Sequence, residues 1–291
     1  TYLRIRESSF MLDIKPMTGA IGAEILGLDL KASISVDLAK ALRHALMDHQ
    51  VIVFRDQHLD IAAQKRLTRV FGSILRLPYV EPMAEDPEVI AVLKEASEAK
   101  VGVFGGEWHS DFSFLETPPA GSVLNAVDVP EVGGDTVWAN QVLAYETLPD
   151  ELRQTVDAHD AIHVGKPYGA KYAPPAKHRA SNSIRMTRGD PNADIERRHP
   201  AALPHPRAGR KALFVNPIYT TRLNGMTDEA SAPILEALYK HSIRPEFCCR
   251  LRWRPGDVAV WDNRLAMHCA VNDYDGARRL LYRTTFSDTP D

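Results

Sequence analysis

Residues 247–261 read FCCRLRWRPGDVAVW, and this stretch decides the fold class. Between 247 and 253, Phe, Cys, Leu and Trp alternate with Cys, Arg and Arg, which predicts a strand with one buried face. The letters PGD at 255–257 predict a turn, and the apolar run at 258–261 predicts a second strand. Short strands separated by turns are typical of β-sandwiches and barrels.

The rest of the chain predicts more strands and a group of helices. Ser35 or Asp37 can cap an amphipathic helix over 33–50, and Asp60 precedes a second helix that ends at Gly72, a suitable C′ glycine. Pro149 interrupts a helical pair over 141–161, and Thr227 can cap a helix that reaches about His241. Further strands are predicted at 51–54, 89–93, 121–129, 212–215 and 278–286. These elements predict an α+β chain with a mainly β core, a sandwich or barrel, and helices packed outside it.

Residues 164–211 fit neither a helix nor a strand. They are rich in Pro, Gly, His, Arg and Lys and show little apolar periodicity. A long irregular segment in a compact domain is usually either a lid or a disordered loop, and the sequence leaves both open. We expect a single domain over 1–291 with this insertion. Within it, His178, His199 and His205 are expected to be solvated. His159 and His163 precede it and are candidates to reach the site from the helical insertion.

Composition excludes several classes of protein. The chain has 291 residues and a net charge of −3, which argues against general nucleic-acid binding. No apolar run approaches the roughly 18 residues of a membrane span, and residues 1–6 lack the apolar stretch of a signal peptide. Three cysteines make no disulfide framework, so we expect a cytoplasmic protein. Met11 is a candidate start, which leaves open whether residues 1–10 are native.

Two histidines and a carboxylate form the candidate metal site. His109 and Asp111 are two residues apart, so on an extended chain both side chains point the same way. His268 lies far along the chain, but a sandwich or barrel can bring distant strands together. Two His and one carboxylate form the facial triad of non-haem Fe(II) oxygenases. The same set could hold the zinc of a hydrolase.

A strand of arginines follows. In RRLLYRTT, residues 278–285, Arg279 and Arg283 share one face with Leu281 and Thr285. That face could be solvated, with the arginines as surface charges. If it is buried, each arginine must meet an anion, because an unpaired buried charge is expensive. A His-x-Asp pair, a remote His and a trailing arginine together are what a 2-oxoglutarate-dependent oxygenase needs.

The chain resembles the taurine dioxygenase and 2,4-D dioxygenase family of Fe(II)/2-oxoglutarate enzymes from about residue 14 to 285. The motifs that carry the resemblance are WHSDFSF at 108–114, ETPPA at 116–120, GGDT at 133–136, ALFVN at 212–216, WDNR at 261–264, His268 and the arginine strand. The resemblance implies a double-stranded β-helix, or jelly roll, with flanking helices and a lid. It implies His109, Asp111 and His268 as iron ligands, and Thr136 and Arg279 on the distal carboxylate of 2-oxoglutarate. Arg283 is implied to face both the substrate's anionic group and the chelated end of the keto acid.

The same resemblance implies Fe(II), 2-oxoglutarate and O₂ as requirements, with stimulation by ascorbate. The expected reaction hydroxylates a small anionic molecule next to a heteroatom, and forms succinate and CO₂. Dimers or tetramers are common in the family, so a homo-oligomer is expected, with no nucleic-acid or membrane partner.

The substrate pocket departs from the taurine enzymes. Leu77 stands where they place a histidine, and Gly105 stands where they place an asparagine. A pocket lined by Leu77, Val80 and Phe112 suits an apolar anion, such as an aryloxyalkanoate, an alkyl sulfate or sulfonate, or a related carboxylate. Taurine or an alkanesulfonate remains an alternative, as does a jelly roll that binds a metal or anion without catalysis.

Overall fold

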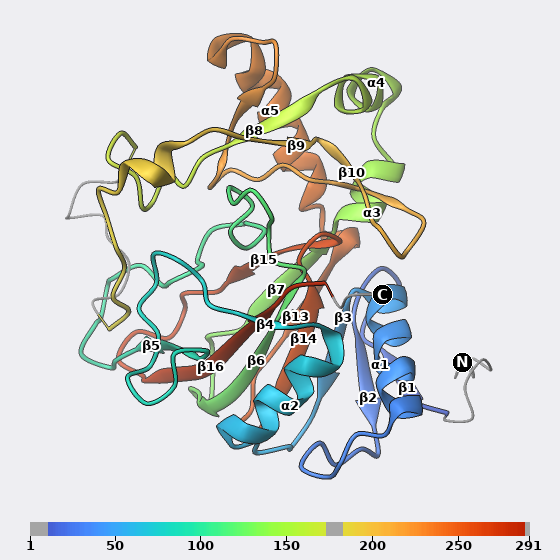
Figure 1. Ribbon diagram of the computed structural model, residues 1–291, viewed down its shortest axis with the longest axis vertical. Coiled ribbons are helices and arrows are strands. Elements are labelled where there is room, and N and C mark those ends of the chain that lie inside the picture. Colours follow the sequence, from blue (N-terminus) through green and yellow to red (C-terminus); the bar gives the residue numbers. More distant parts are fainter. Residues whose placement is uncertain (1–10, 173–182, 289–291) are drawn as a thin grey trace.

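The computed structural model describes residues 11–172 and 183–288. Its largest element is an eight-stranded sheet (Figure 1). The strands run in the order β1 (Asp13–Pro16), β2 (Ala23–Leu26), β3 (Val51–Phe54), β14 (Val258–Asp262), β6 (Gly121–Asp128), β16 (Arg279–Phe286) and β4 (Ile74–Leu75), and β5 (Ile90–Lys94) also pairs with β16. Of these pairs, β2 and β3 are parallel and the others are antiparallel.

A second sheet of three strands completes a β-sandwich. It has the order β13 (Cys248–Leu251), β7 (Thr136–Asn140) and β15 (Ala266–Ala270). The chain passes repeatedly between the two sheets: β13 lies in the small one, β14 in the large one, β15 in the small one and β16 in the large one. The predicted turn at 255–257 is therefore a crossing between sheets. The expected jelly roll is confirmed.

The interior of the sandwich is apolar. Trp138, Leu251 and Ala266 from the small sheet share one buried cluster with Leu124 and Trp261 from the large sheet. Trp138 and Trp261 are both fully buried, with ring centroids 5.9 Å apart in an edge-on arrangement. Aromatic side chains of this size bury the most apolar area and fix the distance between two sheets.

Two helices cover the outer face of the large sheet, α1 (Val36–His49) and α2 (Ile61–Phe71) (Figure 1). Of the two caps predicted for α1, Ser35 is the one used, because it accepts a hydrogen bond from the Leu38 backbone N–H. Asp60, which precedes α2, accepts one from the Ala63 backbone N–H. Gly72 ends α2 as predicted, but the prediction that it acts as a C′ glycine is wrong. Its φ of 169° is extended, and an added Cβ would lie 1.6 Å from the Ser287 carbonyl oxygen, so the position needs a glycine for close approach.

An insertion between β7 and β13 forms the upper part of the molecule in Figure 1. It contains α3 (Gln141–Glu146), α4 (Asp150–Ala158), α5 (Asp228–Ser242) and two 3₁₀ turns, η2 (Pro191–Asp194) and η3 (Pro245–Phe247). Its strands are β8 (Asp160–His163), β9 (Arg197–Pro200), β10 (Ala202–Pro204), β11 (Lys211–Leu213) and β12 (Thr220–Leu223). The helices and strands share their own apolar cluster, which includes Leu148, Leu223 and Leu238.

The expectation that 164–211 lacks regular structure is wrong for part of this segment. β9 pairs with β8, and β10 pairs with β11. Both strands are short, and only His199 of β9 is buried, so no apolar periodicity marks them. Residues 173–182, which include His178, lie outside the described residues.

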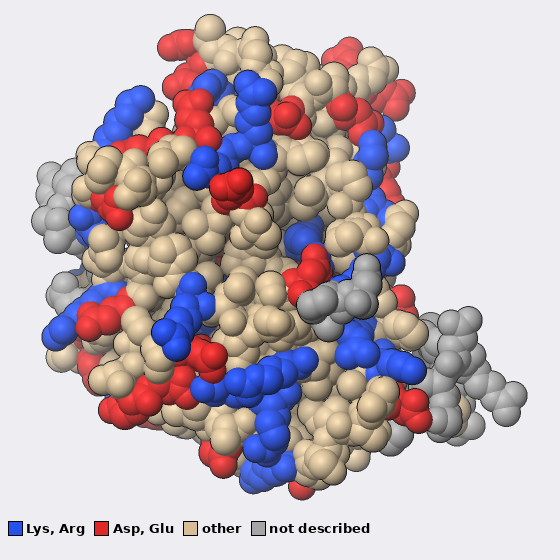
Figure 2. Space-filling view, viewed as in Figure 1, with Lys and Arg blue, Asp and Glu red and all other residues tan. Residues whose placement is uncertain are grey.

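The surface agrees with the charge balance of the sequence. On the face in Figure 2, basic and acidic side chains are interspersed around a mostly uncharged middle area. None of the helices in the described part of the chain is both long enough and apolar enough to cross a membrane.

Candidate active site

The three residues predicted to bind a metal lie together. His268 is on β15, and its backbone forms a two-bond bridge with His109, with N···O distances of 3.0 and 2.9 Å. Asp111 follows His109 by two residues, and the donor atoms of all three side chains lie within 4.8 Å of one another. All three side chains are buried, at 6%, 1% and 7% exposure for His109, Asp111 and His268.

The Asp111 carboxylate has two different environments. Its Oδ1 lies 3.4 Å from His109 Nε2 and 3.8 Å from His268 Nε2. Its Oδ2 accepts a hydrogen bond from Ser122 Oγ at 3.2 Å and forms an ion pair with Arg283 Nη2 at 2.7 Å. Burial alone raises the pKa of Asp111, but the charge of the adjacent Arg283 outweighs it and holds that pKa well below its usual range. The carboxylate is therefore ionised, with Oδ1 facing the histidines.

Both imidazoles can offer a lone pair at Nε2. His109 Nδ1 lies 2.7 Å from the Glu107 carbonyl, so Nδ1 donates and the tautomer leaves Nε2 unprotonated. Burial, with the neighbouring His109, lowers the pKa of His268 to about 3, so this ring is neutral at neutral pH. Two imidazole nitrogens that can each offer a lone pair and one ionised carboxylate oxygen, all buried, fit the donor set of non-haem Fe(II).

A small cavity leads from the two histidines to Arg279 and Thr136, and Arg283 also lines it. Arg279 is 3% exposed; its Nε donates to the Gly134 carbonyl at 2.8 Å and its Nη2 contacts Thr136 Oγ1 at 3.4 Å. Within the described residues it forms no ion pair. Burial lowers the pKa of Arg279 to about 10, so it is charged at neutral pH and lacks an anionic partner.

Thr136 is oriented to serve the same anion. Its Oγ1 also accepts a hydrogen bond from the Trp253 indole at 2.9 Å. With both the indole and Arg279 pointing at this oxygen, the hydroxyl proton of Thr136 is left to donate. A carboxylate placed in this cavity would thus meet a guanidinium and a hydroxyl donor side by side.

A larger cavity of about 360 Å³ shares His109 with the small cavity and also reaches Asp111. Its wall includes His109, Asp111 and the predicted Phe112, but also residues that carried no motif: Phe104, Tyr168, Met186, Arg188, Ile218 and Tyr219. The Phe112 and Tyr168 rings stack at 5.7 Å. Burial raises the pKa of Tyr168 to about 12, so its phenol stays neutral. The cavity combines an aromatic wall with few charges.

Leu77 and Val80 lie outside the wall of this cavity. Val80 is buried behind it and bridges to Met186 through the backbone, and Leu77 packs partly buried against the same apolar cluster. Gly105, by contrast, does line the cavity, and a Cβ there would lie 3.1 Å from His109 Cε1. A side chain at position 105 would therefore crowd His109.

The expectation that His199 and His205 are solvated is wrong. His199 Nε2 donates to the Leu115 carbonyl at 2.9 Å, and His205 lies 3.0 Å from Asp262 Oδ2; both rings are buried. His163 does not reach the cavities beside the metal-ligand candidates, because it is fully buried against Ser113, with Nδ1 2.9 Å from Oγ. His159 also does not line them; its ring binds the Thr155 carbonyl.

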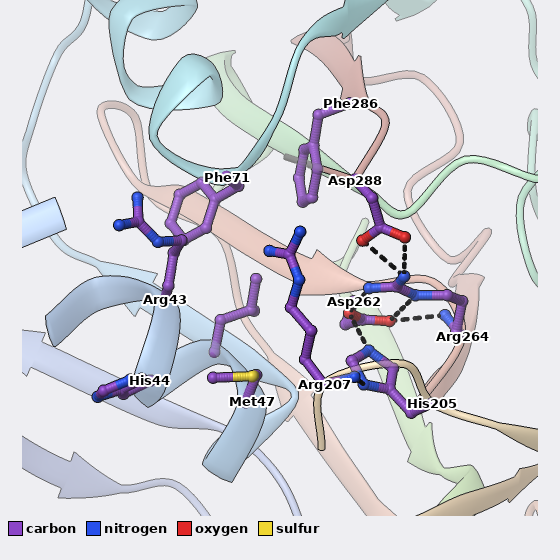
Figure 3. A pocket seen from close by; sticks show the side chains of 11 residues that line it. Arg43, His44, Met47, Phe71, His205, Arg207, Asp262, Arg264, Phe286 and Asp288 are labelled. Carbon is purple, nitrogen blue, oxygen red and sulfur yellow. Dashed lines mark hydrogen bonds and ion pairs between the residues drawn. The ribbon is translucent and has the colours of Figure 1, made fainter. Parts of the chain in front are cut away.

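A third cavity, of about 330 Å³, lies between α1 and the turn after β14 (Figure 3). Arg43, Arg207 and Arg264 line it together with His205 and Asp262. In Figure 3, the Asp262 carboxylate lies between Arg264 and His205, and Arg264 also reaches Asp288 at 2.7 Å. None of the metal-ligand candidates lines this cavity.

Comparison with known proteins identifies the family. The signature of the "Taurine catabolism dioxygenase TauD, TfdA family" matches residues 13–285. The chain is 33% identical over 285 residues to an alkylsulfatase of Acinetobacter baylyi, covering 97% of this chain and 87% of the relative. It is 35% identical over 280 residues to an alpha-ketoglutarate-dependent sulfate ester dioxygenase of Pseudomonas putida, covering 95% and 89%. A taurine dioxygenase structure from Burkholderia xenovorans superposes with a TM-score of 0.78 at 31% identity, covering 95% and 89%.

The chain belongs to the taurine catabolism dioxygenase TauD, TfdA family. It is an Fe(II)/2-oxoglutarate-dependent dioxygenase, an oxidoreductase that uses Fe(II), 2-oxoglutarate and O₂. The predicted enzyme class and these cofactors are confirmed. The membership also favours this class over a zinc hydrolase and over a non-catalytic jelly roll.

Proposed function

We propose that this dioxygenase hydroxylates an alkyl sulfate ester or a similar apolar organic anion, at a metal held by His109, Asp111 and His268. One observation carries the proposal: the buried donor cluster stands between an aromatic cavity and a cavity that ends at Arg279. The first cavity suits the substrate and the second suits the dicarboxylate. Relatives named for sulfate esters support the choice of substrate class.

Bound at these three residues, Fe(II) would supply the chemistry that couples oxidative decarboxylation of 2-oxoglutarate to hydroxylation of a C–H bond. The chain's own residues do the positioning. Arg279 and Thr136 would hold the distal carboxylate, and Arg283, which already pairs with Asp111, would face the other end of the keto acid. The aromatic wall excludes water from the substrate's apolar body.

The expected stoichiometry is one 2-oxoglutarate and one O₂ consumed per substrate, with succinate and CO₂ formed. One oxygen atom enters succinate and the other enters the substrate. A sulfate ester hydroxylated at the carbon that bears the ester oxygen splits into an aldehyde and sulfate. The hydroxyl proton leaves with the sulfate, and the C–O bond to sulfate breaks.

The anionic head of the substrate has two candidate partners. Arg283 was the sequence prediction, but its guanidinium is shared with Asp111 Oδ2, Ser122 and Thr285. Arg188 is the one Lys or Arg in the described wall of the aromatic cavity, and its Nη1 donates to the Pro167 carbonyl at 2.8 Å. We propose that Arg188 contributes the positive charge that selects anions, with Arg283 closer to the keto acid.

The test is succinate formation with Fe(II), 2-oxoglutarate, O₂ and ascorbate across a substrate panel. The panel holds alkyl sulfates, alkanesulfonates, taurine and both enantiomers of a phenoxypropionate. We expect alkyl sulfates to stimulate succinate formation most, with aldehyde and sulfate formed in equal amounts. Taurine as the best substrate would overturn the proposed substrate class, and no succinate with any metal loading would overturn the proposed site.

Two further parts of the proposal concern the cellular location and the oligomeric state of the protein. The cysteines Cys248, Cys249 and Cys269 are free thiols, which suits the reducing cytoplasm. A dimer or tetramer is expected in solution, and light scattering of the purified chain tests this.

A further inference from the structure

The backbone of Asp111 is paired with a side chain. The N–H of Asp111 donates to Asn263 Oδ1 at 2.6 Å, and Asn263 Nδ2 donates to the Asp111 carbonyl at 2.8 Å. The same Nδ2 donates to the Pro119 carbonyl at 3.1 Å. Asn263 is fully buried. Its amide therefore gives Asp111 the two hydrogen bonds that a neighbouring strand would otherwise provide.

The chain needs such a partner because it leaves the strand direction immediately after Asp111. Phe112 has a φ of 47°, a left-handed conformation that a bulky residue rarely adopts. His109 is still held by its backbone bridge to His268. Between that bridge and the bend at Phe112, the Asn263 amide is what fixes the peptide groups on both sides of the Asp111 side chain.

The turn that presents Asn263 is itself rigid. Asn263 N–H donates to the Ala120 carbonyl at 2.9 Å. The Asp262 carboxylate accepts from the Arg264 backbone and side chain at 2.9 and 3.1 Å, and its other oxygen faces His205, as Figure 3 shows. Residues 263–265 join β14 to β15, and β15 carries His268. One turn thus holds two of the metal-ligand candidates in register.

We propose that Asn263 is a positioning residue for the metal site. It fixes the Asp111 backbone so that Oδ1 faces the two histidines while Oδ2 stays with Arg283 and Ser122. It touches neither the metal nor the substrate. This inference rests on the proposed function, because it takes His109, Asp111 and His268 as the metal ligands.

Calorimetric titration of the metal-stripped full chain with Mn(II) measures the Mn(II) Kd and tests the inference. Asn263→Ala removes all three hydrogen bonds of the amide. Asn263→Asp keeps the shape and the acceptor, but it sets a carboxylate against the carbonyls of Asp111 and Pro119. Outer-shell partners of metal ligands are worth about tenfold to a hundredfold in affinity, so the Mn(II) Kd is expected to rise by about that factor in both variants.

Asn125→Ala is the matched control. Asn125 is also a buried amide; its Nδ2 donates to the Leu59 carbonyl at 2.9 Å, and it contacts none of the three metal-ligand candidates. We expect Asn125→Ala to lower the Tm of the apoprotein while it keeps the wild-type Mn(II) Kd. At saturating Fe(II), the KM for 2-oxoglutarate in the Asn263 variants is expected to stay near the wild-type value, because Arg279 and Thr136 are untouched.

The outcomes separate the inference from the proposed function. Wild-type protein that fails to bind Mn(II) would refute the proposed metal site. Wild-type binding together with an unchanged Kd in a folded Asn263→Asp variant would refute the positioning role alone. If Asn263→Ala does not fold, the Mn(II) Kd of Asn263→Asp decides whether the positioning role holds. A Kd that rises equally in Asn125→Ala would also reject the inference, because the effect would then come from a general loss of stability.

Discussion

Replacing Arg279 by Met separates the cost of a buried charge from its use in binding. The guanidinium is 3% exposed, and within the described residues it has no carboxylate partner. Its hydrogen bonds go to the Gly134 carbonyl and Thr136 Oγ1. Met keeps an unbranched apolar stem of similar length and removes the charge. We expect the variant to lose affinity for 2-oxoglutarate and to keep its fold.

The structure sets the size of both effects. Lowering the pKa of Arg279 from 12.5 to about 10 corresponds to roughly 3 kcal/mol against the charged form in the folded protein, at about 1.4 kcal/mol per unit. Removing the charge removes this free-energy cost. The Gly134 carbonyl, however, then lacks a hydrogen-bond donor, which costs about 1–3 kcal/mol. The free energy of unfolding should therefore stay the same or rise slightly. Two charge-assisted hydrogen bonds to a carboxylate are worth about 3 kcal/mol or more, which predicts at least about a hundredfold rise in KM.

The assay measures succinate formation against 2-oxoglutarate concentration, and urea unfolding of the protein without keto acid. Arg278→Met is the matched control, because the neighbouring Arg278 is 39% exposed in its side chain and pairs with Glu95 and Asp128 at the surface. The control should leave KM unchanged. A KM in Arg279→Met equal to that of the wild type would refute the anchor and move it to Arg283. A large loss of stability would refute the claim that the buried charge lacks a partner.

Four further predictions follow from the same contacts. Asp111→Ala should abolish Mn(II) binding and turnover and destabilise the fold, because Arg283 loses its partner; activity with normal iron content would contradict this. Arg188→Gln should raise the KM for alkyl sulfates but not for 2-oxoglutarate; an unchanged KM would leave Arg283 as the partner of the anion. Gly105→Ala should weaken Mn(II) binding, since φ is +73° and the new Cβ would lie 3.1 Å from His109 Cε1; a wild-type Kd speaks against this crowding. Burial, with the charge of His199, lowers the pKa of His163 to about 3, so folding excludes a proton and stability is lost as pH falls below about 6.5, by roughly 3 kcal/mol at about pH 4. Urea midpoints between pH 7 and 4 should decline less in His163→Gln than in the wild type.

The grouping of the candidate metal ligands could be predicted because their residue types are scarce and their order is distinctive. His-x-Asp, a remote His and a strand of arginines form a set that few other chemistries need, and the structure brings all of them around one centre. The starts of α1 and α2 could also be predicted from the sequence, because Ser35 and Asp60 accept short-range hydrogen bonds that depend only on neighbouring residues. In both cases local chemistry carried the information.

The aromatic wall could not be predicted in the same way. Tyr168 and Arg188 lie in a segment without periodicity, and Tyr219 precedes the short strand β12. Their positions depend on pairing between short strands, such as β8 with β9 and β12, whose register the sequence does not specify. Leu77 and Val80 were chosen by analogy of position; one backbone bridge, from Val80 to Met186, places Met186 at the cavity and Val80 behind it.

The arginine strand is the case in which pattern alone left two interpretations and packing decided between them. Alternation put Arg279 and Arg283 on one face of β16 but did not say which face met water. The opposite face is closed by α2, where Gln64 Nε2 donates to the Tyr282 carbonyl at 2.9 Å and the Thr68 and Thr284 hydroxyls lie 2.6 Å apart. With solvent excluded from that side, the strand is buried on both faces, and Arg279 and Arg283 are only 3% and 4% exposed. A strand buried on both faces tolerates arginines only where anions meet them; Asp111 meets Arg283, and Arg279 is the arginine proposed to meet the dicarboxylate.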